Sequence, residues 1–503
     1  MKKLISLVLC ILMLSTLIVG CKKNEEEDLS DGTYTEDTGD LYDENGYLKD
    51  SIPDDIDYGG AKVSIMGWDN VDAKHDFSLD LTDGNTVTRA TYERNKTVEQ
   101  RIGVELAFDL KYKCSGADAV RYQYVSDVER IMDSGTTYDL IACYSQVAAN
   151  FATDGRLLDL MQYKDDILEF DKPWWSSKMV ESSTINDKLY FASGAISTTD
   201  TRQTFILSVN LEMVDSLGLD DPRQLVKDNA WTLEKFYEMC TDVYVDTDTT
   251  NTPGKDSTDI FGYSSIDNVM GDGFFTGAGL KYLSTDNTGK LIIAPEFKGE
   301  KTYNLSETLM GKFKSDNNYF YYFGEDGKTK NIPILTEGRA LFMSTMFGLI
   351  VDNKNKIDYN YGYLPYPKYN SDQTEYYSNS GFPFSMWCMT NMCIGDMGER
   401  AAYVMEALAS GGYRTVQPEV YEQIQYEGNT DATNLEMFEI ILAAKTYDMG
   451  RIFHNQFKWE NAPVALFRMR LYKYDTSDWY SVLSGSESII NDVLKDTNED
   501  FGY

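Results

Sequence analysis

The chain has few residues of the types that most catalytic and nucleic-acid-binding sites need. Its 503 residues include only two histidines, His75 and His454, and neither a G-x-S-x-G nor an H-E-x-x-H motif occurs. Lys and Arg number 46 against 81 Asp and Glu, which gives a formal net charge of −35. This charge argues against nucleic acid and anionic lipid as partners, because both bind clustered Lys and Arg. Nothing in the sequence demands catalysis, so we expect no enzyme and no cofactor.

Cysteine is also sparse. Two cysteines lie near the N-terminus, and the other five are scattered along the chain: Cys114, Cys143, Cys240, Cys388 and Cys393. An odd, scattered set does not indicate a disulfide framework, and the Cys/His spacing of a zinc site is missing. We therefore expect small buried core residues and no metal, with a Cys388–Cys393 bridge as the alternative.

Long apolar runs are missing after the first twenty residues. Lys2 and Lys3 precede an apolar run that ends at Val19, which predicts a signal peptide over residues 1–20. The residues up to Cys21 read Ile-Val-Gly-Cys and resemble a bacterial lipobox, which implies that Cys21 is the mature, lipidated N-terminus. Ordinary cleavage with a free Cys21 is the alternative. The protein is then extracytoplasmic, and only this lipid attaches it to the bacterial cell membrane.

An acidic segment follows the predicted lipid anchor. Residues 21–57 are rich in Asp, Glu, Gly, Ser and Thr and contain few large apolar residues. Such a composition buries too little surface to offset the entropy of ordering, so we expect a disordered tether. About 445 residues remain after it, a length that suits two or three lobes.

Alternating strand and helix patterns fill the rest of the chain. Strands at 62–66, 104–109 and 138–143 alternate with helices at 86–103 and 120–132, and this order predicts a parallel sheet. A second series follows. It comprises strands at 188–192, 204–209, 261–264 and 338–343, and helices at 211–217 and 233–240, the latter capped by Thr232.

Several motifs follow one another in a recognisable order: YDLIACYS, KPWW, TINDKLYFASGAIS, GRALFMS, YGYLPYPKY and YDMGRIF. This order resembles the family 1 extracellular solute-binding proteins, the receptors of bacterial ABC importers for carbohydrates. The resemblance implies an α/β, two-lobed periplasmic-binding-protein-like fold, a carbohydrate ligand, ABC permease subunits as partners and a monomer. It also implies three interlobe crossings, near 194–204, 384–391 and 447–453. The first lobe would comprise 58–197 and 392–448, and the second 203–390 and 452–503.

Relatives in this family often carry a calcium loop where this chain has residues 246–259. Asp246 and Asp248 begin such a loop, but Asn251 and Ser257 stand where the motif needs Gly and Glu. We interpret the segment as a surface loop.

Aromatic and polar residues at strand ends and crossings are the candidate ligand contacts. Aromatic rings offer apolar faces to a sugar, and the chain has 36 Tyr and 7 Trp. Trp68 follows the first strand and is the leading candidate, while the pair in KPWW is equally compatible with packing. The whole predicted set is Trp68, Asp69, Tyr144, Gln146, Trp174, Trp175, Asp200, Arg202, Asp267, Asn268, Met346 and Trp387.

Two alternatives stay open. A surface glycan hydrolase would need two carboxylates on opposite sides of the scissile bond, and a chain this acidic can always supply them. The resemblance and the aromatic content favour an oligosaccharide, with a peptide or another small non-sugar ligand as the nearest alternative.

Overall fold

The computed structural model describes residues 41–82, 84–247, 258–321, 327–425, 431–472 and 478–503. Met1–Ser51 and Ile52–Tyr503 form two compact units. The predicted signal peptide, Cys21 and most of the predicted surface loop at 246–259 lie outside the described residues. None of the described helices is long and apolar enough to cross a membrane.

The body begins earlier than the sequence predicted. Ile52 is only 6% exposed, and the guanidinium of Arg101 donates a 3.1 Å hydrogen bond to its carbonyl. Residues 52–57 therefore belong to the body and not to the tether. Residues 41–51 also carry local structure, because Tyr42 and Leu48 form a β-bridge around a turn closed by Asp43. The acidic composition predicted disorder, but an Asx turn at Asp43 and the buried side chain of Ile52 order these residues.

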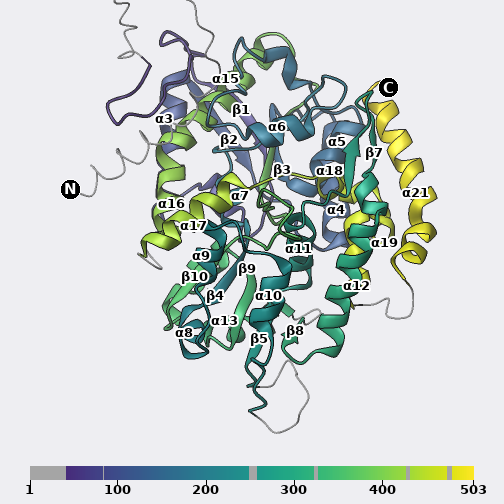
Figure 1. Ribbon diagram of the computed structural model, residues 1–503. Coiled ribbons are helices and arrows are strands. Elements are labelled where there is room, and N and C mark those ends of the chain that lie inside the picture. Colours follow the sequence, from purple (N-terminus) through teal and green to yellow (C-terminus); the bar gives the residue numbers. More distant parts are fainter. Residues whose placement is uncertain (1–40, 83, 248–257, 322–326, 426–430, 473–477) are drawn as a thin grey trace, which may run out of the picture. The chain divides into compact units, whose positions relative to one another are not determined.

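The first sheet has four strands in the order β11-β3-β1-β2 (Figure 1). Its strands are β1 (Ala61–Met66), β2 (Val104–Asp109), β3 (Leu140–Tyr144) and β11 (Ser385–Met389). β1 pairs in parallel with β2 and β3, as the alternating pattern predicted. β11 pairs antiparallel with β3, with Trp387 opposite Ala142. The segment expected as a crossing at 384–391 is therefore mostly a strand of the first sheet.

The second sheet has five strands in the order β10-β4-β9-β5-β8. Its strands are β4 (Phe205–Asn210), β5 (Phe261–Ser265), β8 (Tyr319–Phe320), β9 (Ala340–Met346) and β10 (Tyr361–Leu364). β4 pairs antiparallel with β9 and β10, whereas β5 pairs in parallel with β8 and β9. A separate hairpin joins β6 (Leu283–Thr285) to β7 (Leu291–Ile293).

The prediction of a strand at 188–192 is wrong. These residues form only isolated bridges, Ile185 with Lys188 and Ala192 with Trp387. Asn186 and Asp187 have φ of 51° and 58°, which turns the chain immediately before the predicted strand.

Helices surround both sheets. Beside the first sheet lie α2 (Lys74–Phe77), α3 (Thr86–Ile102), α4 (Asp118–Asp133), α5 (Ala148–Thr153), α6 (Ser177–Ser183) and α15 (Asp396–Gly411). The others begin with α7 (Thr199–Arg202), α8 (Leu211–Ser216), α9 (Pro222–Lys227), α10 (Leu233–Cys240), α11 (Gly271–Gly277), α12 (Glu300–Ser315), α13 (Gly327–Thr336) and α14 (Phe347–Asn353). They continue with α16 (Gln417–Gln425), α17 (Ala432–Ala443), α18 (Met449–Ile452), α19 (Lys458–Asn461), α20 (Pro463–Tyr472) and α21 (Trp479–Asp500).

Local signals define several helix ends: Gly103 and Thr232 do so as expected, and Asn85 was not predicted. Asn85 caps α3 by accepting the amide of Val87 at 2.9 Å, and Gly103 ends the helix with φ 68°. Thr232 caps α10 by accepting the amide of Lys235. The five cysteines of the body are all free and buried, so the Cys388–Cys393 bridge does not form.

Helix α17 packs on the second sheet, although its residues were expected in the first lobe. Asn434 donates to the carbonyl of Tyr361 at 3.0 Å and accepts the amide of Tyr363 at 3.3 Å, both in edge strand β10. Arg223 of α9 donates to the same Asn434 side chain at 3.1 Å. One buried amide thus joins α17 to a sheet edge that would otherwise expose unpaired backbone groups.

The segments between the sheets are bonded to one another. The amide of Phe205 donates to Asn379 at 2.8 Å, and that of Gly381 donates to Gln203 at 2.7 Å. On the other side, the amide of Ser378 donates to Ala444 at 2.9 Å. Residues 203–205, 378–381 and 444–446 therefore form one hydrogen-bonded group of three chain segments.

Candidate functional site

The predicted aromatic residues of the first sheet lie together but are buried. Trp68 has no exposed surface and its indole N–H donates to the Ser385 hydroxyl at 3.0 Å. Tyr144, at the end of β3, meets the Trp68 ring edge-to-face with centroids 5.2 Å apart. Gln146 is 2% exposed, and its side-chain oxygen has no partner among the described residues. Trp387 is fully buried within β11.

The two tryptophans of KPWW share one buried carboxylate. Glu406 of α15 accepts the indole N–H of Trp174 at 2.6 Å and that of Trp175 at 2.9 Å. Burial raises the pKa of Glu406 to about 8, and the two indole hydrogen bonds act in the opposite direction. These contacts are consistent with packing, which was one of the two interpretations of the motif.

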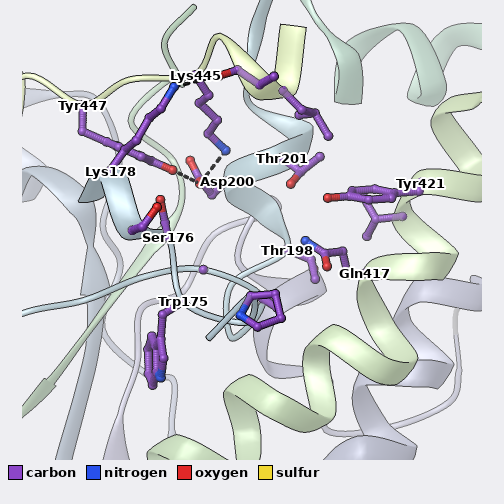
Figure 2. A pocket seen from close by; sticks show the side chains of 17 residues that line it. Trp175, Ser176, Lys178, Thr198, Asp200, Thr201, Gln417, Tyr421, Lys445 and Tyr447 are labelled. Carbon is purple, nitrogen blue, oxygen red and sulfur yellow. Dashed lines mark hydrogen bonds and ion pairs between the residues drawn. The ribbon is translucent and has the colours of Figure 1, made fainter. Parts of the chain in front are cut away.

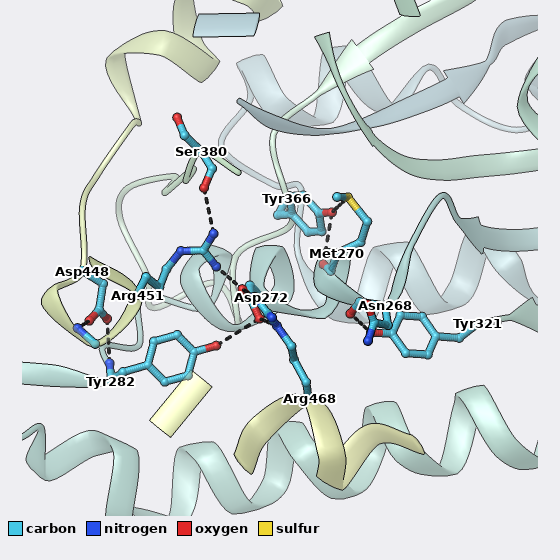
Figure 3. A network of polar contacts seen from close by, with 11 residues as sticks. Asn268, Met270, Asp272, Tyr282, Tyr321, Tyr366, Ser380, Asp448, Arg451 and Arg468 are labelled. Carbon is cyan, nitrogen blue, oxygen red and sulfur yellow. Dashed lines mark hydrogen bonds and ion pairs between the residues drawn. The ribbon is translucent and has the colours of Figure 1, made fainter. Parts of the chain in front are cut away.

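The predicted residues of the second sheet lie around its strand ends. Asp267 and Asn268 follow β5 and are half-buried, and the Tyr321 hydroxyl donates to the carbonyl of Asn268 (Figure 3). Ser344, Thr345 and Met346 were expected beyond the strand, but they are its last residues because β9 runs to Met346.

A network of buried charges lies beside these strand ends (Figure 3). Asp272 of α11 has no exposed surface and accepts hydrogen bonds from both Arg451 and Arg468. Arg451 also donates to the carbonyl of Ser380 at 2.7 Å, so it joins α11 to one of the connecting segments. Its guanidinium lies 4.4 Å from the centre of the Phe382 ring.

A neighbouring carboxylate completes the network. Asp448 accepts the amide of Tyr282 at 2.6 Å and that of Gly450 at 2.7 Å. Burial raises the pKa of Asp448 to about 6, while these amides and Arg451 act in the opposite direction.

A pocket of about 390 Å3 lies against the connecting segments (Figure 2). Its walls come from the start of α6, from α7, from α16 and from the residues after α17. The residues that line it include Trp175, Lys178, Thr198, Asp200, Tyr421 and Lys445. Two predicted residues, Trp175 and Asp200, therefore lie at the same pocket.

Asp200 is the centre of this pocket's polar contacts. The carboxylate is 4% exposed, and its Oδ2 accepts from Lys445 Nζ and from the Tyr447 hydroxyl, both at 2.6 Å (Figure 2). Its Oδ1 has no partner among the described residues, and neither has the hydroxyl of Thr198.

The remaining predicted residues lie elsewhere. Asp69 is exposed and forms a β-bridge with Lys113. Arg202 is buried and donates to Asp352 at 2.6 Å and to Gln423 at 3.3 Å. The structure thus divides the predicted set among the ends of two sheets, the Glu406 cluster and the pocket.

Sequence reasoning missed the charged partners of these sites: Glu406, Asp272, Lys445, Arg451 and Arg468. Arg451 and Tyr447 belong to the YDMGRIF motif, which marked their region but not their contacts. Each partner is distant in sequence from the residue that it meets, so no local pattern could find it. Among the described residues, no group of three His, Cys, Asp or Glu side chains is placed to hold a metal.

Comparison with solved structures gives consistent matches at low identity. A substrate-binding protein of an ABC transporter from Listeria monocytogenes, in complex with cycloalternan, is 13% identical with a TM-score of 0.55, covering 87% of this chain and 99% of that chain. The galacto-N-biose- and lacto-N-biose I-binding protein of an ABC transporter from Bifidobacterium longum, in complex with lacto-N-biose, is 11% identical with a TM-score of 0.55, covering 88% and 98%.

This chain has the two-lobed fold of the ABC-transporter solute-binding proteins. The binding-protein fold also occurs in UgpB from Mycobacterium tuberculosis, in complex with glycerophosphocholine, at 11% identity and a TM-score of 0.53, covering 87% of this chain and 98% of that chain. No family model and no curated protein matches the sequence. The binding-protein fold is therefore established by structure, while the low identity transfers no ligand.

Proposed function

We propose that this protein captures a carbohydrate, an oligosaccharide in the first instance, between its two lobes and delivers it to an ABC importer. The observation that carries the proposal is the extent of the structural likeness, which covers 98–99% of two neighbours that hold saccharides. Two lobes that close on a ligand can present the closed form to a permease. The ligand residues would be those at the strand ends, among them Tyr144, Gln146, Asp267 and Asn268.

A thermal-shift screen tests this function. A ligand that binds only the folded state raises the melting temperature, and at a hundred times its Kd it adds about 2.7 kcal/mol. We expect a rise of several degrees with at least one oligosaccharide. A response to peptides alone, or to none of the compounds, would contradict the proposal.

A glycerophosphodiester belongs in the same screen, because one neighbour is bound to glycerophosphocholine. This compound is the second candidate ligand class. A response to it without a response to saccharides would keep the binding function and change the ligand.

A binding protein releases its saccharide unchanged, whereas a glycan hydrolase releases shorter fragments. We infer that the chain is not an enzyme, because the neighbours with this fold are binding proteins. The saccharide found in the screen should be recovered intact after long incubation with stoichiometric protein. Shorter fragments would identify a hydrolase.

The N-terminus carries a separate proposal. Cys21 follows the Ile-Val-Gly sequence that resembles a lipobox, and we infer that a lipid on Cys21 holds the monomeric protein on the outer side of the cell membrane. Cys21→Ser should move the protein from the membrane fraction to the soluble fraction. A wild-type mass without added lipid would contradict the anchor.

A further inference from the structure

The pocket at Asp200 is separate from the strand ends that would hold a ligand between the lobes. None of the residues at the ends of β1, β3, β5 or β9 lines it. Its lining comes instead from α6, α7, α16, the end of α17 and the residues that follow α17 (Figure 2). A volume of about 390 Å3 falls within the range of small-molecule sites, about 300–1,000 Å3.

Two buried oxygens at this pocket lack hydrogen-bond partners among the described residues. They are Oδ1 of Asp200 and the hydroxyl of Thr198, and both residues are 4% exposed. The other carboxylate oxygen of Asp200 accepts hydrogen bonds from Lys445 and Tyr447, which hold the carboxylate in place. A buried carboxylate oxygen without a donor costs free energy, and a bound donor group would remove that cost.

The charged side chains at the pocket limit which ligand group can donate a hydrogen bond to Asp200. Lys178 and Lys445 both line it, which disfavours an ammonium group or a metal cation beside the single carboxylate. The carboxylate in turn disfavours a phosphate or another carboxylate at the same point. A neutral hydroxyl fits both conditions, because it can donate a hydrogen bond to Asp200 and accept one from Lys178.

The apolar part of the lining fits a compact ligand with C–H faces. The half-buried ring of Tyr421 and the side chain of Leu442 border the pocket on the side of α16 and α17. Hydroxyl groups on one face and C–H groups on the other are the surface of a cyclic polyol or a small sugar.

We propose that this pocket is a second binding site, for a small polyhydroxylated molecule whose hydroxyl group donates to Asp200 Oδ1. The site does not depend on the function proposed above, because its residues differ from those at the strand ends. A ligand here would contact both Asp200 of α7 and Lys445, and Lys445 belongs to one of the three hydrogen-bonded connecting segments.

Isothermal titration with myo-inositol, D-glucose and maltose tests the site in the whole protein. We expect at least one of them to bind the wild type. Asp200→Asn should weaken this binding at least about tenfold, because the amide keeps its oxygen for Lys445 and Tyr447 and turns an NH2 group to the free position. Thr198→Val should weaken it less.

Two further variants separate pocket occupancy from the ion pair. Ala443→Trp adds bulk at the exposed rim of the pocket without removing Asp200 or Lys445, and it should abolish this class of binding. Asp352→Asn, a carboxylate outside the pocket lining, should leave it unchanged. Binding that survives in both Ala443→Trp and Asp200→Asn, or no binding of any of the three compounds by the wild type, would overturn the proposal.

Discussion

The indole N–H of Trp174 donates a 2.6 Å hydrogen bond to the carboxylate of Glu406, which lies 232 residues further along the chain. Trp175 donates to the same carboxylate, and Glu406 has no exposed surface. The connection near the KPWW motif and helix α15 are thereby fixed to one another through a single acid whose pKa is raised.

The free energy of unfolding should fall as the pH rises, because the pKa of Glu406 is raised in the folded state. Its folded-state pKa is about 8 against an ordinary value of 4.5, so the stabilisation is fully present below about pH 4.5 and is lost as the pH rises through 8. The free energy of unfolding should therefore decrease between pH 6 and pH 9, by a few kcal/mol at most. Glu406→Gln, neutral throughout, should flatten this dependence, and Glu181→Gln, on the exposed face of α6, should not. An unchanged slope in Glu406→Gln would contradict the assignment.

Trp68 should behave as a core residue. Its ring is fully buried and its N–H is bonded to Ser385, so Trp68→Ala should destabilise the protein by ~3–5 kcal/mol in urea unfolding. Trp68→Phe keeps most of the buried area and should cost less. If Trp68→Ala instead abolishes ligand binding and leaves the unfolding midpoint unchanged, the ring belongs to the ligand site.

Removing the charge of Asp272 should leave two buried guanidiniums without the carboxylate that they share. We expect Asp272→Asn to lower the free energy of unfolding by ~3–5 kcal/mol, because Arg451 and Arg468 are 6% and 3% exposed. Glu487→Gln removes the partner of Lys298 in an exposed pair and should change stability by less than ~1 kcal/mol. Equal effects of the two substitutions would show that the buried network contributes little.

Limited proteolysis should end near Ser51. Residues from Ile52 onward belong to the body, and Ile52 is tied to Arg101. Mass spectrometry should therefore find a stable fragment that begins close to Ile52. A chain that begins at Tyr58 should unfold at a lower temperature than one that begins at Ile52, and equal melting temperatures would return residues 52–57 to the tether.

The sequence predicted those helices and strands whose structure depends on residues close to one another in the chain. The periodic patterns located β1, α3, β2 and α4 to within about two residues, and the caps Gly103 and Thr232 define ends that the pattern anticipated. Motif order was sufficient to predict the two-lobed fold.

These local patterns do not predict contacts between residues that are distant in the sequence. Nothing near Ser385 indicates that it joins β3 as an antiparallel partner, and nothing near Asn434 indicates that it binds β10. The same applies to the site, since Asp200 and Trp175 were predicted from their positions, but Lys445 and Tyr421 come from segments more than 200 residues away. The predicted aromatic contacts were strand-end residues, and the structure buries Trp68 and Tyr144, which pack against each other, while Trp68 also binds Ser385.

The three connecting segments are bonded side by side, and this limits how the lobes can move. A bend at residues 203–205 changes the positions of Asn379 and Gly381, which are held by backbone hydrogen bonds, and through Ser378 it also moves Ala444. We therefore expect the three segments to move together when the lobes rotate. A substitution that breaks one of these hydrogen bonds should therefore affect all three segments.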